Sequence, residues 1–353
     1  MISKTRLLHG LRLAALCLLT PALAPAAEPP GIPDGWSDGF VYANGVRLHY
    51  YRAVPAEGKP VIVMAHGVTD NGLCWTTVSE KLQGDYELYM LDTRGHGLSD
   101  PFAASDDGDT LIKDVVAAVK ALDVEKPILM GHSMGAATVM RVGAEYPELA
   151  KAVVMLDPFL PRAGGEGRRG GPGARNRGGA SEAPREAEAP RSRRSDAGSG
   201  EAPRQPARPA PARRAERDRL SFQMMADPET LVAQNNHKFE DIVATGRRQF
   251  PKWSDADVKY WALSKKQYHG AYSDQAWQAM SGAMRIGDSL GRIPVPSLIL
   301  KADAPPEGRQ ANEASVEGME RVKLVHIDGG AHNLHHDELE RTVKELNGFL
   351  SGL

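Results

Sequence analysis

A single serine between two glycines is the feature of the sequence that most clearly suggests chemistry. In "ILMGHSMGAATVM", residues 128–140, Ser133 lies between Gly131 and Gly135, after an apolar run and within the start of an alanine-rich one. Glycine and serine are both less favourable than alanine inside a helix, so the two glycines indicate a geometric requirement rather than packing. The pattern predicts a nucleophilic hydroxyl on a tight turn between a strand and a helix, and such a hydroxyl needs a base within hydrogen-bond reach.

The sequence around this serine alternates between strand-like and helix-like runs. Short apolar runs such as "PVIVMAHG", "YELYMLDTRG", "PILMGHS" and "AVVMLDP" follow proline or polar residues and end in or near Gly, Asp or His. Apolar residues at helical spacing predict helices over 74–82, 110–122 and 134–146, and "GFVYANGVRLHYYRA" predicts a hairpin that turns at Asn44 and Gly45. Apolar strands that alternate with helices predict an α/β fold, a parallel sheet covered on both faces.

A second kind of sequence interrupts this alternation. Residues 220–290 spread tryptophans and tyrosines through charged, helix-like sequence, and the alternation then resumes with "PSLILKAD", a helix over 307–319, "VKLVHIDGG" and a helix over 334–350. Such an insertion predicts a helical cap over the carboxyl ends of the strands, where ligands bind in sheets of this kind. The predicted core therefore consists of residues 28–160 and 291–353, with the cap between its two parts.

Two further segments are expected to lie outside the folded core. Residues 1–27 combine a positively charged start, a short apolar run and small residues, which predicts a cleaved signal peptide and an exported protein, periplasmic or secreted. Residues 161–219 hold 15 arginines and 8 acidic residues but no aromatic residue and no Leu, Ile, Val or Met, so this insertion is expected to be disordered. We interpret it either as a cationic tether to an anionic surface or polymer or as a tolerated surface loop.

The charge and the cysteine content indicate which binding partners and which disulfide bonds to expect. The chain has 43 Lys and Arg against 45 Asp and Glu, a formal net charge of −2, and its arginine-rich insertion has no aromatic residues on which bases could stack. We therefore expect no nucleic-acid partner, and nothing in the sequence implies a stable protein partner. Cleavage of the signal peptide would leave Cys74 as the one remaining cysteine, which forms no internal disulfide.

The serine motif and its surroundings resemble the α/β-hydrolase superfamily, in its single-cap, esterase-like branch. "GHSMG" is similar to the Gly-x-Ser-x-Gly nucleophile elbow, and it follows the strand-like run "PILM" directly before a helix, as that motif requires. The resemblance implies a mostly parallel sheet with helices on both faces and a helical cap inserted after the sixth strand. It also implies that Ser133 is the nucleophile, where haloalkane dehalogenases and epoxide hydrolases of this fold carry an aspartate.

The resemblance also assigns a base and an oxyanion hole. His332, in "VHIDGGAHNLHHD", follows the last apolar strand and precedes the last helix, where the superfamily keeps its base. "AHGVTDNG" is similar to the superfamily's His-Gly-x loop, so the backbone N–H of Val68 is the first expected oxyanion donor and that of Met134 is the second.

The other histidines near these motifs are expected to have structural roles. His335, His336 and Asp337 are expected to cap and cover the start of the last helix, because no second histidine-rich segment with ligand spacing accompanies them. His132 is expected to fill space under the elbow. Neither a metal nor an organic cofactor is implied.

Two aspartates compete for the third place in a catalytic triad. Most relatives place the acid after the strand "PSLILKAD", but their usual register falls on Pro305, and Asp303 comes two residues earlier. Other branches take the acid from the end of the preceding strand, where "VVMLDP" offers Asp157. We favour Asp157, because it directly ends an apolar run one strand beyond the nucleophile. The other aspartate is then a helix cap or a loop ligand.

These residues together predict a serine hydrolase that cleaves a carboxylic ester of a small molecule through a covalent acyl-enzyme. Lactonase, thioesterase and cofactor-free haloperoxidase-like perhydrolase activities use the same triad and are alternatives. A non-catalytic binding protein on the same fold is an alternative of another class. The acyl and alcohol parts of the substrate depend on how the cap closes over the site, which the sequence does not show.

Overall fold

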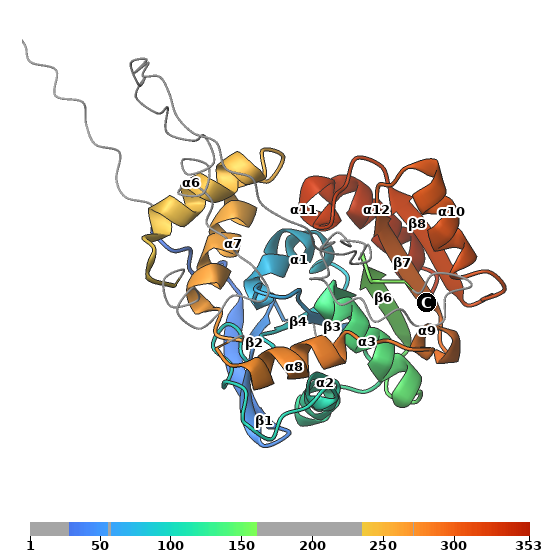
Figure 1. Ribbon diagram of the computed structural model, residues 1–353, viewed down its shortest axis with the longest axis horizontal. Helices are drawn as coiled ribbons and strands as arrows, with labels where there is room; N and C mark the ends of the chain where they lie inside the picture. Colours follow the sequence, from blue (N-terminus) through green and yellow to red (C-terminus); the bar gives the residue numbers. More distant parts are fainter. Residues whose placement is uncertain (1–27, 56–57, 161–234, 271) are drawn as a thin grey trace, which may run out of the picture.

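The computed structural model describes residues 28–55, 58–160, 235–270 and 272–353, which form an eight-stranded sheet between layers of helices (Figure 1). The predicted signal peptide, the predicted arginine-rich insertion and the first part of the predicted cap lie outside these residues. The strands are β1 (Ser37–Ala43), β2 (Val46–Arg52), β3 (Val61–Ala65), β4 (Glu87–Leu91), β5 (Ile128–His132), β6 (Ala152–Leu156), β7 (Ser297–Ala302) and β8 (Val322–Ile327). The helices are η1 (Gly72–Trp75), α1 (Thr76–Leu82), α2 (Thr110–Ala121), α3 (Met134–Glu145), α6 (Phe239–Gln249), α7 (Asp255–Gln267), α8 (Asp274–Ala283), α9 (Ser289–Arg292), α10 (Pro306–Ala314), α11 (Leu334–Asp337) and α12 (Leu339–Leu350).

The sheet is mostly parallel, as the sequence predicts. Its strands lie in the order β1-β2-β4-β3-β5-β6-β7-β8, and those from β3 to β8 are parallel to their neighbours among themselves. β2 is antiparallel to both β1 and β4. The predicted hairpin turns at Asn44 and Gly45, whose φ angles of 47° and 79° are both left-handed, as a two-residue hairpin turn requires.

Alternate residues of the central strands face opposite helix layers. Val63 and Ala65 of β3 belong to the apolar cluster of α2 and α3, whereas Ile62 and Met64 belong to the cluster of α1 and α12. Because successive side chains of a strand point to opposite faces, a strand covered on both faces must be apolar at nearly every position. This requirement explains the continuous apolar runs that the sequence shows.

The helices after the sixth strand pack partly on each other and partly on the main core. α6 and α7 pack on each other around an apolar cluster of their own, which includes Ile242, Trp253 and Val258. α7 also packs on η1 and α1 of the main core. α8 joins the main core through Met280 and Ala283 and packs on α2 and α3. The described part of the cap therefore has a small core of its own and an anchor on the main core.

The last predicted helix is divided in two at Glu338. This residue has φ −138° and ψ 58°, outside the helical region, and it separates α11 from α12. The carboxylate of Asp337 accepts hydrogen bonds from the Trp253 indole N–H and the Ala331 N–H, both at 2.8 Å. These hydrogen bonds connect α11 to the cap and to the preceding loop.

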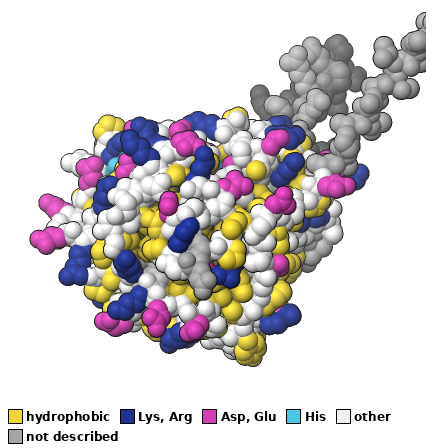
Figure 2. All heavy atoms as spheres, turned by 180° about the vertical axis from the view of Figure 1, so that it is seen from behind, with side chains coloured by type: hydrophobic (Ala, Val, Ile, Leu, Met, Phe, Trp, Pro, Cys, Tyr) yellow, Lys and Arg dark blue, Asp and Glu magenta, His cyan; other side chains and the backbone are white. Residues whose placement is uncertain are grey.

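Charged side chains of both signs are interspersed on the face of the molecule in Figure 2, with hydrophobic atoms exposed between them. This mixed distribution agrees with the nearly neutral formal charge of the whole chain. Among the residues that the structure describes, no helix has both the length and the apolar character needed to cross a bilayer.

Candidate active site

Ser133 occupies the turn between β5 and α3 in a conformation that is rare for a residue with a side chain. Its φ of 53° and ψ of −111° lie outside the helical and extended regions. Two backbone hydrogen bonds hold the turn. Ser133 N–H donates to Leu156 O at 3.0 Å, and Gly135 N–H donates to His66 O at 3.1 Å. The turn has the strand-to-helix geometry of a nucleophile elbow.

Close backbone approaches explain the two glycines of the motif. A Cβ on Gly135 would lie 2.1 Å from Ala65 O, and a Cβ on Gly131 would lie 2.2 Å from Gly135 O. Both distances are far below van der Waals contact, and backbone atoms of the sheet and helix cannot move aside as a flexible side chain could. Glycine is therefore needed at both positions for α3 to begin in direct contact with β3 and β5.

We expect Gly135→Ala to lower the free energy of unfolding by about 3 kcal/mol or more, because the added methyl overpacks a site bounded by backbone. Gly348→Ala on α12 is the matched control, because a Cβ there meets nothing within 4 Å. That control should be unchanged or stabilised by about 0.5–1 kcal/mol. Urea unfolding of both variants measures the difference, and equal stabilities would contradict the close approach.

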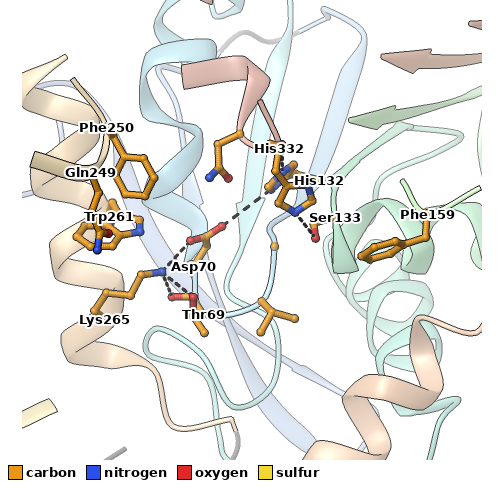
Figure 3. A pocket seen from close by; sticks show the side chains of 13 residues that line it. Thr69, Asp70, His132, Ser133, Phe159, Gln249, Phe250, Trp261, Lys265 and His332 are labelled. Atoms are coloured by element: carbon orange, nitrogen blue, oxygen red, sulfur yellow. Dashed lines mark hydrogen bonds and ion pairs between the residues drawn. The ribbon is translucent and has the colours of Figure 1, made fainter. Parts of the chain in front are cut away.

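Ser133, His332 and Asp157 lie in one hydrogen-bonded line at the carboxyl edge of the sheet. His332 Nε2 is 2.9 Å from Ser133 Oγ, and His332 Nδ1 is 2.6 Å from Asp157 Oδ2. Figure 3 shows the imidazole beside the serine hydroxyl, on the loop that follows β8. Since an ionised carboxylate only accepts hydrogen bonds, Nδ1 carries the proton, and Nε2 can accept the hydroxyl proton.

Asp157 is held in its ionised form by its surroundings. Its Oδ1 is 2.5 Å from Lys301 Nζ and accepts a hydrogen bond from Ala302 N–H at 3.1 Å. Burial alone would raise the pKa of Asp157, but the hydrogen bond to His332 and the charge of Lys301 outweigh burial and lower the pKa to about 2. The side chain is thus a carboxylate throughout the neutral and mildly acidic range.

The structure places Asp303 away from this line. Its carboxylate accepts a hydrogen bond from Gly329 N–H at 2.9 Å and lies 2.5 Å from Arg309 Nη2. The backbone hydrogen bond from Gly329 and the interactions with Arg309 lower the pKa of Asp303. Asp303 joins the loop after β8 to α10, so it is a loop ligand rather than a neighbour of the imidazole.

The loop over residues 66–70 forms a second wall of the site. Val68 lies on this loop and lines the same cavity as the serine. Asp70 N–H donates to Gly67 O at 3.2 Å, which closes the loop into a turn. In the described part of the chain, neither Val68 N–H nor Met134 N–H donates a backbone hydrogen bond. Met134 is the first residue of α3, where the N–H has no acceptor within the helix. Both N–H groups therefore stay candidates for the predicted oxyanion hole.

His132 has a larger role than the space filling predicted for it. Its Nε2 donates to His332 O at 2.9 Å, so the residue before the nucleophile holds the loop that carries the imidazole. Burial lowers the pKa of His132 to about 3, which keeps its ring neutral.

The histidines after the base connect α11 to its surroundings instead of capping a long helix. The ring of His335 stacks on Trp75 with centroids 5.1 Å apart, and His336 Nδ1 lies 2.8 Å from Asp257 Oδ1 of α7. Burial alone would raise the pKa of Asp257, but the hydrogen bond and charge of His336 outweigh it and lower that pKa. Among the described residues, no cluster of three His, Cys, Asp or Glu side chains is suited to a metal ion.

A cavity of about 400 Å³ adjoins Ser133 between the core and the cap. Figure 3 shows Phe250 and Trp261 of the cap on one side of it and Phe159, which follows β6, on the other. Lys265 of α7 also lines the cavity and contacts the 66–70 loop. Aromatic, polar and charged side chains therefore share the walls, and core and cap both contribute to them.

The sequence patterns did not single out two lysines of this site, Lys301 and Lys265. A lone lysine in the apolar strand run "PSLILKAD" is a usable signal for Lys301, because a buried ammonium group needs an acidic partner. Lys265 has no such local signal, because α7 carries several charges and the partner Asp70 is 195 residues away in the sequence.

Comparison with known families decides the family of the chain. A family model described as alpha/beta hydrolase fold matches residues 60–339. The chain belongs to the α/β-hydrolase family. The order of the sheet, the elbow at Ser133 and the position of His332 after the last strand are those of an α/β hydrolase.

Two curated relatives of this α/β hydrolase match part of its length. N-formylmaleamate deformylase of Pseudomonas putida is 36% identical over 132 residues, 37% of this chain and 47% of the relative. 2-(Acetamidomethylene)succinate hydrolase of Mesorhizobium japonicum is 31% identical over 98 residues, 28% of this chain and 35% of the relative. The match spans less than half the length of each of these relatives.

Solved structures share the fold over nearly the whole chain. The crystal structure of E-2-(acetamidomethylene)succinate hydrolase superposes with a TM-score of 0.59 and covers 90% of this chain and 99% of that one. Its identity of 16% makes this a likeness of fold alone. The relatives and the family model thus establish an α/β hydrolase.

Proposed function

We propose that this α/β hydrolase is a serine hydrolase that cleaves a carboxylic ester of a small molecule through a covalent acyl-enzyme. The observation that carries the proposal is the line from Ser133 Oγ to His332 Nε2 at 2.9 Å and from His332 Nδ1 to Asp157 Oδ2 at 2.6 Å. A serine hydroxyl is a weak nucleophile unless such a base takes its proton. The composition of residues 1–27 supports action outside the cytoplasm.

In the proposed acylation step, Ser133 Oγ attacks the ester carbonyl carbon while His332 Nε2 takes the hydroxyl proton. The negative charge that develops on the carbonyl oxygen is stabilised by the N–H groups of Val68 and Met134. Asp157 stabilises the imidazolium that forms. The tetrahedral intermediate then breaks its bond to the alcohol oxygen, which receives the proton from His332.

Deacylation repeats the same proton transfers with water. His332 Nε2 takes a proton from a water molecule that attacks the acyl carbon, and the same two N–H groups stabilise the second oxyanion. The bond to Ser133 Oγ then breaks, the oxygen recovers its proton, and a carboxylic acid leaves. The low pKa of Asp157, about 2, keeps the partner of the imidazolium charged during both steps.

The proposed substrate is small and has an apolar part. The cavity has about 400 Å³ of space, near the lower end of ligand pockets, and Phe159, Phe250 and Trp261 supply aromatic surface on both sides of it. These walls favour an acyl or alcohol group of a few carbons or a single ring over a long chain.

A fluorophosphonate probe and a panel of p-nitrophenyl esters test this function. We expect the probe to label the protein at Ser133, and we expect kcat/KM to be highest for short acyl chains and to fall as the chain outgrows the cavity. A folded protein that neither labels nor hydrolyses any member of the panel would instead be the non-catalytic binding protein.

Hydrolysis of a small amide is the second candidate, because one of the matched relatives is named a deformylase. The site would use the same steps, with His332 delivering its proton to a leaving nitrogen. An ester and an amide with the same acyl group separate the two candidates, because an amide hydrolase should cleave both and an ester hydrolase should leave the amide intact.

Lys301 allows a pH test of the proposed mechanism. Its positive charge lies against Asp157 and opposes the stabilisation of a nearby imidazolium, so Lys301→Met should make that cation more favourable. The acidic limb of the kcat/KM profile should then move to higher pH. Lys323→Met is the control, because Lys323 on β8 pairs with Glu345 at 3.3 Å and is half exposed. A shift to lower pH, or equal profiles, would contradict the assigned charge arrangement.

A further inference from the structure

Lys265 is a buried cation that the proposed catalytic steps do not use. Its side chain is 2% exposed, and it projects from cap helix α7 into the lining of the active-site cavity. Its ammonium group also lies 5.3 Å from the centre of the Trp261 ring. Because a buried charge is costly unless well paired, its hydrogen bonds indicate what it stabilises.

These hydrogen bonds converge on two adjacent residues of the core. Lys265 Nζ donates to Thr69 O at 2.8 Å, to Thr69 Oγ1 at 2.7 Å and to Asp70 Oδ1 at 3.0 Å. Figure 3 shows the ammonium group between these acceptors, with the cap helix on one side and the 66–70 loop on the other. The cap is thus bonded directly to the loop that carries the first oxyanion donor.

Thr69 needs this support because of its backbone conformation. It has φ 66°, in the left-handed region, which a β-branched residue rarely adopts. It directly follows Val68, and the turn is closed by the hydrogen bond from Asp70 N–H to Gly67 O. A change of Thr69 to an ordinary conformation would therefore disturb the turn that carries Val68.

Asp70 extends the same contact toward the base. Its Oδ2 lies 4.0 Å from Nδ1 of His132, the residue that donates to His332 O. A Cβ on Gly67 would lie 3.0 Å from that Oδ2 and 2.9 Å from that Nδ1, so the loop backbone rests on both side chains. The ammonium group of Lys265 thus holds the carboxylate of Asp70, and the backbone of the 66–70 loop packs against that carboxylate.

We propose that Lys265 is a positioning residue, through which the cap holds the 66–70 loop in the conformation that aims the Val68 N–H at the oxyanion. The proposal rests on the function proposed above. If so, catalysis requires α7 to be packed against the 66–70 loop. This role is separate from the contribution of α7 to the cavity wall. Lys265 itself does not contact the reacting atoms.

The test compares Lys265→Met with Lys266→Met, using p-nitrophenyl acetate. Lys266 is the matched control because it adjoins Lys265 on α7 but donates to His237 O within the cap, at 2.8 Å. Loss of one oxyanion donor lowers kcat by about 10²–10³-fold, so we expect Lys265→Met to lower kcat by about 10²-fold with KM within threefold. Lys266→Met should keep both constants within about twofold of the parent.

The rate of fluorophosphonate labelling gives a second readout, because phosphonylation also places an oxygen in the oxyanion hole. It should fall with kcat in Lys265→Met, at a temperature where circular dichroism shows the folded protein. If that variant does not fold, Asp70→Asn keeps the side-chain shape and should lower kcat at least about tenfold at unchanged KM.

Two results would overturn the proposal: an unchanged kcat in these variants, or a raised KM with unchanged kcat, which would assign Lys265 to substrate binding. Failure of the proposed function is a separate result. It would appear as a parent protein that neither labels nor hydrolyses the ester, whatever residue stands at position 265.

Discussion

Replacement of Ser133 by alanine should lower ester hydrolysis by about 10⁴-fold or more, and His332→Ala should do the same, because nucleophile and base act as one unit. The double variant should be scarcely worse than either single variant, since the removal of one member already disables the other. The measurement is kcat/KM on the best p-nitrophenyl ester, with trace contamination checked by active-site titration.

Matched controls separate this effect from general damage. Ser281→Ala removes a serine hydroxyl that donates to Gln278 O on α8, and His326→Ala removes an imidazole that contacts Asn312 beside β8. Both controls should retain activity within a few-fold of the parent. Activity within tenfold of the parent in a folded Ser133→Ala protein would exclude Ser133 as the nucleophile.

Asp157→Asn should lower turnover by about 10⁴-fold while the fold remains intact, because the orienting acid determines which imidazole nitrogen carries the proton. The geometry makes the amide a poor substitute. Asp157 accepts hydrogen bonds through both oxygens, from His332 on one side and from Ala302 N–H and Lys301 on the other. An asparagine must turn its NH₂ group toward one of these donors, so it either reverses the imidazole tautomer or leaves a buried donor unpaired.

Asp303→Asn is the comparison that makes this prediction decisive. Asp303 contacts Gly329 and Arg309 on the exposed loop side, so its amide variant should lose less than about tenfold in turnover. The reverse order of damage would move the acid to Asp303. Equal, mild losses in both variants would mean that neither aspartate completes a triad.

The local sequence determined the fold class and the position of the elbow. Strand and helix patterns are read over a few residues, and the strands near Ser133 are apolar throughout because both faces of the sheet are covered. The turn at Asn44 and Gly45 and the glycines on either side of Ser133 express backbone requirements at the residues themselves. Such requirements are visible in sequence because few residue types can meet them.

The sequence favoured Asp157 over Asp303, but only the tertiary structure shows which aspartate lies beside His332. Asp157 and Asp303 both follow apolar strands, so their local patterns are nearly equivalent. The difference lies in where each side chain points at the end of its strand: Asp157 meets the imidazole at 2.6 Å, and Asp303 meets Arg309. Side-chain direction at a strand end depends on the neighbouring strands and loops, which are distant in sequence.

The same reason explains the features that sequence patterns missed. Glu338 divides the last predicted helix, and its neighbour Asp337 accepts a hydrogen bond from Trp253 of the cap, 84 positions away. Lys265 reaches Thr69 and Asp70 across 195 residues or more. A local pattern reports the conformational preference of a segment, whereas these positions are set by hydrogen bonds that exist only after the cap and the core have packed together.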